Sequence, residues 1–187
     1  MRALKYALAI VPVVVTVLAL TVGVVGATQA THATGRVSLD DVRGATARYH
    51  RLAVATAQGY GLLTDKNGIA CIANPGVGAM GVHYVNGDLV GTTEVNPRTP
   101  EALVYEPEPN GRLALVAVEY VTFQAQWDAT HTARPTLFGQ PFMLTPEGNR
   151  FGLPAFYSLH AWIWKHNPAG MFAMWNPTVH CNSAAGA

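Results

Sequence analysis

The stretch from Ala155 to Cys181 constrains the fold more than any other, because it concentrates large and chemically demanding side chains. It holds three of the four Trp, three of the seven His and two of the five Met. Its first half, residues 156–165, is aromatic and β-branched, which is typical of a strand. Period-2 alternation gives one face of this strand Phe156, Ser158, His160, Trp162 and Trp164. The opposite face is apolar too, so we expect cover on both sides.

A second long strand is predicted at 112–123. A shorter strand at 102–106 and a tight Asn110-Gly111 turn precede it, so the two strands are expected to form a β-hairpin. By alternation, one face of the long strand carries Leu113, Leu115, Ala117, Glu119 and Val121. Glu119 is the only polar residue of that set. Because an isolated buried charge is costly, this carboxylate must be paired, hydrogen-bonded or protonated.

The chain begins its folded part with a helix signal. Ser38 is a good N-cap, Asp40 and Asp41 suit the positive end of a helix, and Gly59 stands where a C-cap is expected. A helix of about 20 residues is predicted between them. The expected fold is α+β: one N-terminal amphipathic helix packed on a mostly antiparallel, curved sheet or half-barrel, in a single domain over 38–187. The polar segment 124–150 is expected to be a lid or a crossover.

Residues 1–30 have the pattern of a targeting segment. Arg2 and Lys5 precede an uncharged, mainly apolar run from residue 6 to 25, and small residues follow at 26–30. The segment is either a signal peptide, cleaved after Ala27 or Ala30, or an uncleaved membrane anchor, and 31–37 is a linker. The protein is therefore expected outside the cytoplasm, secreted or at the cell surface. Membrane contact is expected only through an uncleaved leader.

Charge argues against a nucleic-acid partner. Without Arg2 and Lys5 of the leader, 10 of the 12 Lys and Arg remain against 11 Asp and Glu, which leaves a net charge of −1. Nucleic-acid-binding surfaces need a basic excess. A composition of 50% hydrophobic and 12% charged residues indicates a folded body instead.

The two cysteines are expected to pair. Cys71 and Cys181 have no CxxC spacing, and two cysteines in an exported chain most simply form a disulfide. The alternative is that one thiolate is a copper or zinc ligand, which an oxidising compartment disfavours.

Three strands each offer one isolated ionisable residue, which leads to a site hypothesis. His83, Glu119 and His160 would each cost several kcal/mol if buried without a partner, whereas mutual pairing or a shared metal satisfies all three. Two imidazoles and a carboxylate suit zinc, copper or iron, with a position left for a ligand. The side chains expected to bind that ligand are Tyr84, Tyr105 and Trp162.

A copper site near the C-terminus is a separate alternative. Met171 and Met174 lie near His166 and His180 in the sequence, and thioether ligands favour copper. Methionine is, however, more often a filler of irregular core space.

Two further function classes stay open. In an enzyme, a buried Glu119 with a raised pKa would act as general acid or base beside His83 or His160. No GxSxG, HExxH or catalytic-cysteine pattern indicates a particular reaction. A structural or interaction protein of the cell surface would need no site at all.

Four ordered motifs carry a resemblance to a known family. They are GAMGVHYVN at 78–86, ALVYEP at 102–107, LVAVEY at 115–120 and LHAWIWKHNPAGMF at 159–172. With them the chain resembles a family of small exported bacterial proteins with no assigned function, over residues 38–181. The resemblance implies export, a single domain and the Cys71–Cys181 pair, but no reaction. Many relatives have Asp before the Trp where this chain has Met174 before Trp175, so no carboxylate role carries over there.

Overall fold

The computed structural model describes residues 37–181, which belong to one compact unit. The predicted leader at 1–30 lies outside the described residues, as does nearly all of the linker. None of the helices between residues 37 and 181 has the length and hydrophobicity that a membrane span requires.

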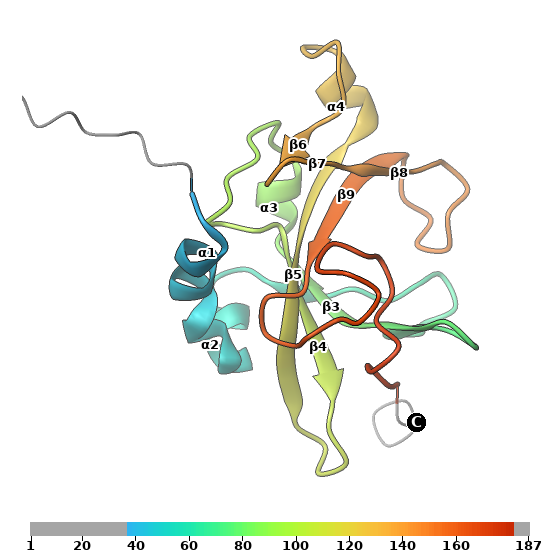
Figure 1. Ribbon diagram of the computed structural model, residues 1–187. Coiled ribbons are helices and arrows are strands. Elements are labelled where there is room, and N and C mark those ends of the chain that lie inside the picture. The colour runs from blue at the N-terminus through green and yellow to red at the C-terminus, as the bar shows by residue number, and fades with distance from the viewer. Residues whose placement is uncertain (1–36, 182–187) are drawn as a thin grey trace, which may run out of the picture. The chain divides into compact units, whose positions relative to one another are not determined.

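A seven-stranded antiparallel sheet forms the centre of the fold (Figure 1). The strand order is β1-β3-β4-β5-β9-β8, and β2 also pairs with β3. The strands are β1 (Gly61–Leu62), β2 (Cys71–Asn74), β3 (Gly78–Val85), β4 (Ala102–Pro107), β5 (Leu113–Phe123), β8 (Met143–Thr145) and β9 (Phe156–Ala161). The expected α+β class with a mostly antiparallel sheet is confirmed.

Helices cover one face of this sheet (Figure 1). The segment predicted as a single helix is divided into α1 (Leu39–Thr46), the 3-10 helix η1 (Ala47–His50) and α2 (Leu52–Ala57). Ser38 and Asp41 form the capping box that starts α1. The break follows η1, where Arg51 is extended. There the Tyr105 hydroxyl donates to the Tyr49 carbonyl at 2.8 Å, which replaces the bond that a continuous helix would make.

The β4–β5 hairpin is confirmed, but a β-bulge changes which residues share a face. Val104 pairs with Ala117, whereas its neighbour Tyr105 pairs with Leu115, so Val116 is the extra residue. Leu115 therefore packs into the cluster beneath the helices. Glu119 lies beyond the bulge on the opposite face. The prediction that Leu113 and Leu115 share a face with Glu119 is wrong for this reason.

Strand β9 is shorter than the predicted strand and ends at Ala161. The chain turns out of the sheet there, because the Ile163 amide bonds back to the Ala161 carbonyl and the Trp162 amide donates to Met171. Trp164 consequently reaches the helices, where its Nε1 donates to Thr46 Oγ1 at 3.3 Å. The predicted placement of Trp164 on the face of His160 is therefore wrong.

The segment 124–150 crosses from β5 to the edge of the sheet. It contains α4 (Gln124–Asp128) and the separate pair β6 (Thr136–Leu137) and β7 (Gln140–Pro141), and it ends by adding β8 to β9. The pairing of Met143 with Ser158 fixes this edge beside the face that carries His160. The small helix α3 (Gly87–Val90) follows β3, and Asn86 caps it.

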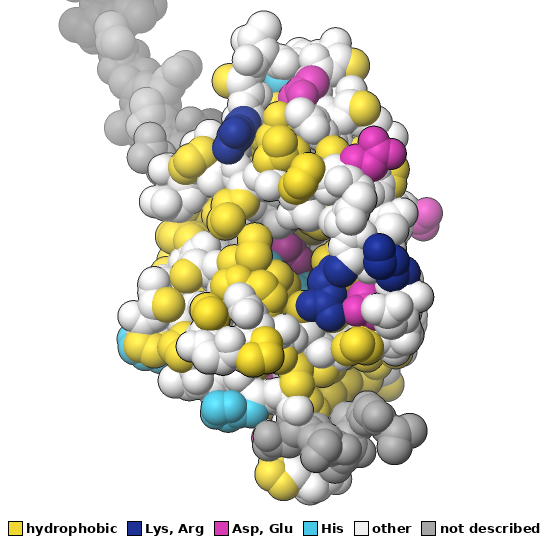
Figure 2. Space-filling view, turned by 90° about the vertical axis from the view of Figure 1, so that its right-hand side faces the viewer, with side chains coloured by type: hydrophobic (Ala, Val, Ile, Leu, Met, Phe, Trp, Pro, Cys, Tyr) yellow, Lys and Arg dark blue, Asp and Glu magenta, His cyan; other side chains and the backbone are white. Residues whose placement is uncertain are grey.

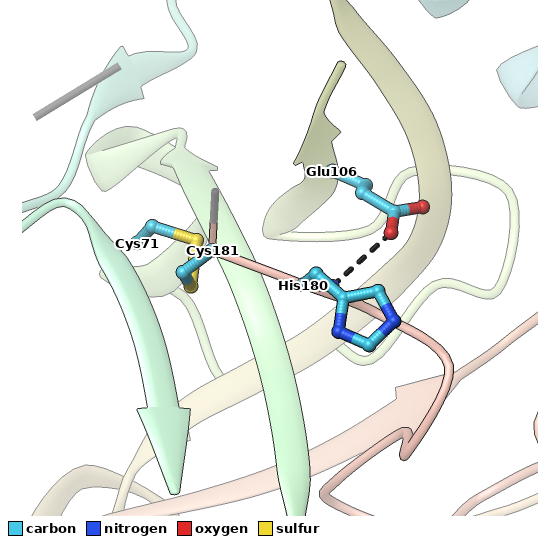
Figure 3. The surroundings of a disulfide bond; sticks show 4 residues. All are labelled: Cys71, Glu106, His180 and Cys181. Carbon is cyan, nitrogen blue, oxygen red and sulfur yellow. Dashed lines mark hydrogen bonds between the residues drawn. A yellow bond between two sulfur atoms is a disulfide. The ribbon is translucent and has the colours of Figure 1, made fainter. Parts of the chain in front are cut away.

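The predicted disulfide between Cys71 and Cys181 is present (Figure 3). Beside it, Glu106 of β4 accepts a hydrogen bond from the His180 amide at 3.1 Å. The other oxygen of Glu106 pairs with Lys165 Nζ at 2.6 Å. A disulfide is typical of an oxidising, extracytoplasmic compartment.

The C-terminal tail also pairs with β3 independently of the disulfide. Ala79 and Asn176 exchange two backbone hydrogen bonds of 3.1 and 3.0 Å, and Asn176 is fully buried. Val179 packs against Ala79 and Trp162 in a small second core. The tail therefore covers the end of the sheet that lies opposite α4.

Candidate metal centre and its cavity

The sheet face that bears Glu119 lines a cavity of about 210 Å³. Figure 2 shows an acidic side chain and a histidine recessed among hydrophobic side chains on one side of the molecule. Most of the lining is apolar: Leu63, Met80, Val85, Val90, Val121, Phe123, Phe151, Leu153, Phe156 and Met174. The polar side chains are His83, Glu119, Thr145, Ser158 and His160. The cavity is thus mainly apolar, with Ser158 close to Glu119 and His160, and with Thr145 apart from them opposite Phe156.

The register of the sheet brings the three predicted site residues together. Glu119 of β5 lies directly opposite His160 of β9, so their side chains leave the same face side by side. His83 of β3 is separated from Glu119 by the whole of β4. On β4, Ala102 lies opposite Glu119 and Val104 lies opposite His83, so the His83 and Glu119 side chains meet diagonally across β4.

The distances describe one compact cluster of donor atoms. His83 Nε2 lies 3.5 Å from Glu119 Oε2 and 3.4 Å from His160 Nε2. Glu119 Oε1 lies 3.4 Å from His160 Nδ1. One donor atom from each residue can be chosen so that all three lie within 4.8 Å of one another. Within residues 37–181, no other group of three or more His, Cys, Asp or Glu side chains is placed to hold a metal ion.

These spacings fit a four-coordinate metal. Zinc bonds of about 2.0 to 2.2 Å in a tetrahedron place neighbouring donor atoms roughly 3.3 to 3.6 Å apart. An octahedral shell with the same bond lengths would place them roughly 2.8 to 3.1 Å apart. The 3.4 and 3.5 Å separations from His83 Nε2 match the tetrahedral value, whereas the three donor atoms together span up to 4.8 Å, so the third pair has to close when a metal binds. Three protein ligands leave one position of a tetrahedron free, as catalytic and ligand-binding zinc sites do.

Burial sets the protonation of the cluster. It lowers the pKa of His83 to about 4 and that of His160 to about 4, because the cationic form of each imidazole would lose its hydration. It also raises the pKa of Glu119, against the smaller opposing effects of His83 and Ser158. Both imidazoles are therefore neutral at neutral pH and offer lone pairs to a metal.

The two histidines are held differently. Metal-binding imidazoles usually donate their second ring nitrogen to a partner that fixes the ring. His160 has such a partner, because its Nδ1 faces Glu119 Oε1. In the described part of the chain, His83 Nδ1 is the only buried side-chain nitrogen or oxygen atom without a hydrogen-bond partner. Glu119 and His160 therefore form the better-fixed part of the site, and His83 completes it.

The three residues expected to bind a ligand do not line the cavity. Tyr84 and Tyr105 lie on the helix-covered face, where their rings contact each other with centroids 5.5 Å apart. Trp162 is buried beside His160, with the two rings stacked at 6.0 Å, and its Nε1 donates to the Ala173 carbonyl. The structure thus corrects the placement of the two tyrosines, and Trp162 supports His160 from the side.

The C-terminal methionines and histidines do not gather into one site. Met174 lines the cavity, whereas Met171 packs against the two hydrophobic clusters. His166 and His180 are exposed. The structure therefore gives no common centre for the alternative copper site.

Glu101 is a buried carboxylate that the sequence analysis did not single out. It is 2% exposed, and its Oε2 accepts a hydrogen bond of 3.0 Å from the Val121 amide. Burial raises its pKa from 4.5 to about 7, and the nearby Glu119 adds to the shift. In the sequence, Glu101 is marked only by its position directly before the apolar strand β4.

Replacing Glu101 by Gln is expected to flatten the pH dependence of stability. Between pH 4.5 and about 7 the folded protein keeps a proton that the unfolded chain releases, so the wild-type free energy of unfolding falls as pH rises. The Gln side chain is neutral at every pH, and its oxygen can still accept the hydrogen bond from the Val121 backbone amide. Between pH 4.5 and about 7, the free energy of unfolding measured in urea should fall by about 2 kcal/mol more in the wild type than in the variant. Parallel curves for the two proteins would contradict the assignment, since all other titrating groups are shared.

No family model, curated protein or solved structure matches the chain. The site itself is therefore the evidence for its function.

Proposed function

We propose that the protein is an exported metal-binding protein in which His83, Glu119 and His160 hold one divalent transition metal. The observation that carries the proposal is the convergence of two neutral imidazoles and one carboxylate, from three separate strands, on one buried point. The disulfide supports the extracytoplasmic setting. The physiological role is the binding of the metal together with a small molecule that reaches its free position.

Zinc is the metal that the donor set and spacing favour. Two nitrogens and one oxygen, with both separations from His83 Nε2 near the tetrahedral value, suit Zn²⁺ with one open position. Iron(II) bound by two histidines and a carboxylate takes six ligands at shorter separations, and copper(II) prefers a tetragonal arrangement. Copper and iron are the competing metals in the test.

The full chain, purified from an oxidising compartment, is expected to bind one equivalent of zinc. The protein would be stripped with a chelator, offered zinc, copper(II) and iron(II) in separate dialyses, and analysed by elemental mass spectrometry. His83→Gln, a variant of similar size, should lose the bound zinc. His131→Gln is the matched control, because His131 is exposed, stacks on Trp127 and neither lines the cavity nor belongs to the metal cluster.

Two outcomes would contradict the proposal. One is a zinc content well below one equivalent in folded wild-type protein. The other is an equal zinc content in wild type and His83→Gln. Circular dichroism of each variant would establish that the fold is intact, so that a lost metal is not mistaken for a lost structure.

A second candidate, an enzyme without a resident metal, rests on the pKa of Glu119. A carboxyl group whose pKa is raised by burial, facing a cavity beside two neutral imidazoles, suits general acid or base catalysis. Folded protein that binds no metal would favour this candidate or a structural role at the cell surface. Bound zinc that depends on His83 would favour the first.

A further inference from the structure

The cavity beside the metal centre has a composition that restricts what can enter it. Most of its polar groups gather around the metal centre, whereas Thr145 lies opposite Phe156, and the remaining walls are hydrocarbon and thioether side chains from β3, α3, β5, β9, the segment after β8 and the C-terminal tail. Phe123, Phe151 and Leu153 belong to these walls. A ligand bound at the metal centre therefore extends mainly over apolar side chains.

We infer that the fourth ligand of the metal is the carboxylate of a small monocarboxylic acid whose apolar tail fills this cavity. The inference rests on the proposed metal site and names the class of molecule that the site takes. It follows from two independent features, the charge of the filled centre and the shape and polarity of the space beside it.

Charge balance favours an anion at the free position. A divalent metal bound by neutral His83, neutral His160 and ionised Glu119 carries a net charge of +1. Glu119 is the only cavity-lining residue that can supply a negative charge. A buried net charge without a partner is costly, and one monoanion removes it. A carboxylate does so with an oxygen donor, which zinc accepts.

The volume of the cavity limits the tail. A cavity of 150 Å³ lined by apolar side chains holds a benzene molecule of about six carbon atoms. The present cavity of about 210 Å³ is correspondingly suited to a ligand of roughly six to eight carbon atoms in all, the carboxyl carbon included. Hydroxide would balance the charge equally well but would leave the apolar space without apolar contacts.

A second charged group on the ligand would find no partner. Among the residues that line the cavity there is no Lys or Arg, and Thr145 and Ser158 are the only hydroxyl side chains. Arg150, which precedes the lining residue Phe151, pairs with Asp65 at 2.8 Å and does not itself line the cavity. Dicarboxylates and zwitterionic amino acids should therefore be excluded.

The test is calorimetric titration of the zinc-loaded full chain with hexanoate, acetate, adipate and hexanol. Each buried methylene strengthens binding about fourfold, so hexanoate should bind at least 10-fold more tightly than acetate. Adipate has a tail of similar length but a second charge, and hexanol lacks the anionic head. Both should bind at least 10-fold more weakly than hexanoate.

A cavity-filling variant supplies the matched comparison. Val121→Phe adds a ring inside the cavity, two residues from Glu119, and should keep zinc while weakening hexanoate at least 10-fold and leaving acetate unchanged. Met143→Phe is the control, because Met143 is 47% exposed and does not line the cavity.

The outcomes separate this inference from the metal proposal. If zinc binds but hexanoate is no tighter than acetate, or Val121→Phe binds hexanoate like wild type, the ligand class is wrong and the metal site stands. If no zinc binds to folded protein, both fall. Tighter binding of hexanol than of hexanoate would overturn the charge argument in particular.

Discussion

Replacing Glu119 by Gln is expected to weaken zinc binding at least about 100-fold, equivalent to about 2.7 kcal/mol. The amide keeps the size of the side chain but removes the only anionic donor of the cluster. Loss of a residue that only hydrogen-bonds to a metal ligand already lowers metal affinity 10- to 100-fold. Glu119 is placed as a ligand itself, so its loss should cost at least as much. Competition with a chromophoric chelator at about pH 7.5 would measure the affinity.

The same substitution should affect the metal-free protein in the opposite direction. Burial raises the pKa of Glu119, which means that the folded state disfavours its ionised form. A neutral amide avoids that cost, so metal-free Glu119→Gln should be at least as resistant to urea as the metal-free wild type. A purely structural ion pair predicts a less stable variant instead.

Glu101→Gln is the matched control for this experiment. Glu101 is also a buried carboxylate, but its oxygen accepts from the Val121 amide and it is not among the residues that could hold a metal. The control should bind zinc like the wild type. Equal loss of zinc in both variants would show that any buried carboxylate matters and that Glu119 is not a specific ligand.

The three site residues were predictable from the sequence because strand parity is a local property. Each is the single ionisable residue on an apolar face, and a buried ionisable group requires a partner. The same parity also argues against Tyr84, since it follows His83 and must point to the other face. Alternation along β3 therefore already places Tyr84 on the face opposite His83.

The face of Leu115 was not predictable in the same way. The extra residue of the bulge, Val116, lies in β5 and turns Leu115 toward the helices, where Tyr105 already lies because β4 alternates regularly and pairs Tyr105 with Val82. A bulge depends on the partner strand as much as on its own residues. Faces assigned by counting alternate residues along β5 alone are therefore wrong on the other side of the bulge.

The break in the N-terminal helical segment also has a non-local cause. Its capping residues and apolar spacing are those of one helix, and only the hydroxyl of Tyr105, 56 residues away in the chain, satisfies the Tyr49 carbonyl. The cavity is similar, because Phe151 and Leu153 reach it from a segment with no regular pattern. The sequence therefore indicates the metal donors better than the space beside them.

Replacing both Cys71 and Cys181 by Ser is expected to lower the free energy of unfolding by about 4 kcal/mol. The disulfide joins residues separated by 110 positions, so its loss frees a long loop in the unfolded chain. Urea unfolding of the metal-free double variant against the wild type would measure the loss. Reduction of the wild type should give a similar value.

The folded tail should nevertheless keep its place in the variant. The paired hydrogen bonds between Ala79 and Asn176, and the bond from the His180 amide to Glu106, do not involve the disulfide. The effect then lies in the unfolded state, which becomes less compact, so the dependence of unfolding free energy on urea should become steeper. A loss under about 1 kcal/mol, or a shallower dependence, would instead mean that the tail detaches from β3 and that the disulfide acts on the folded protein.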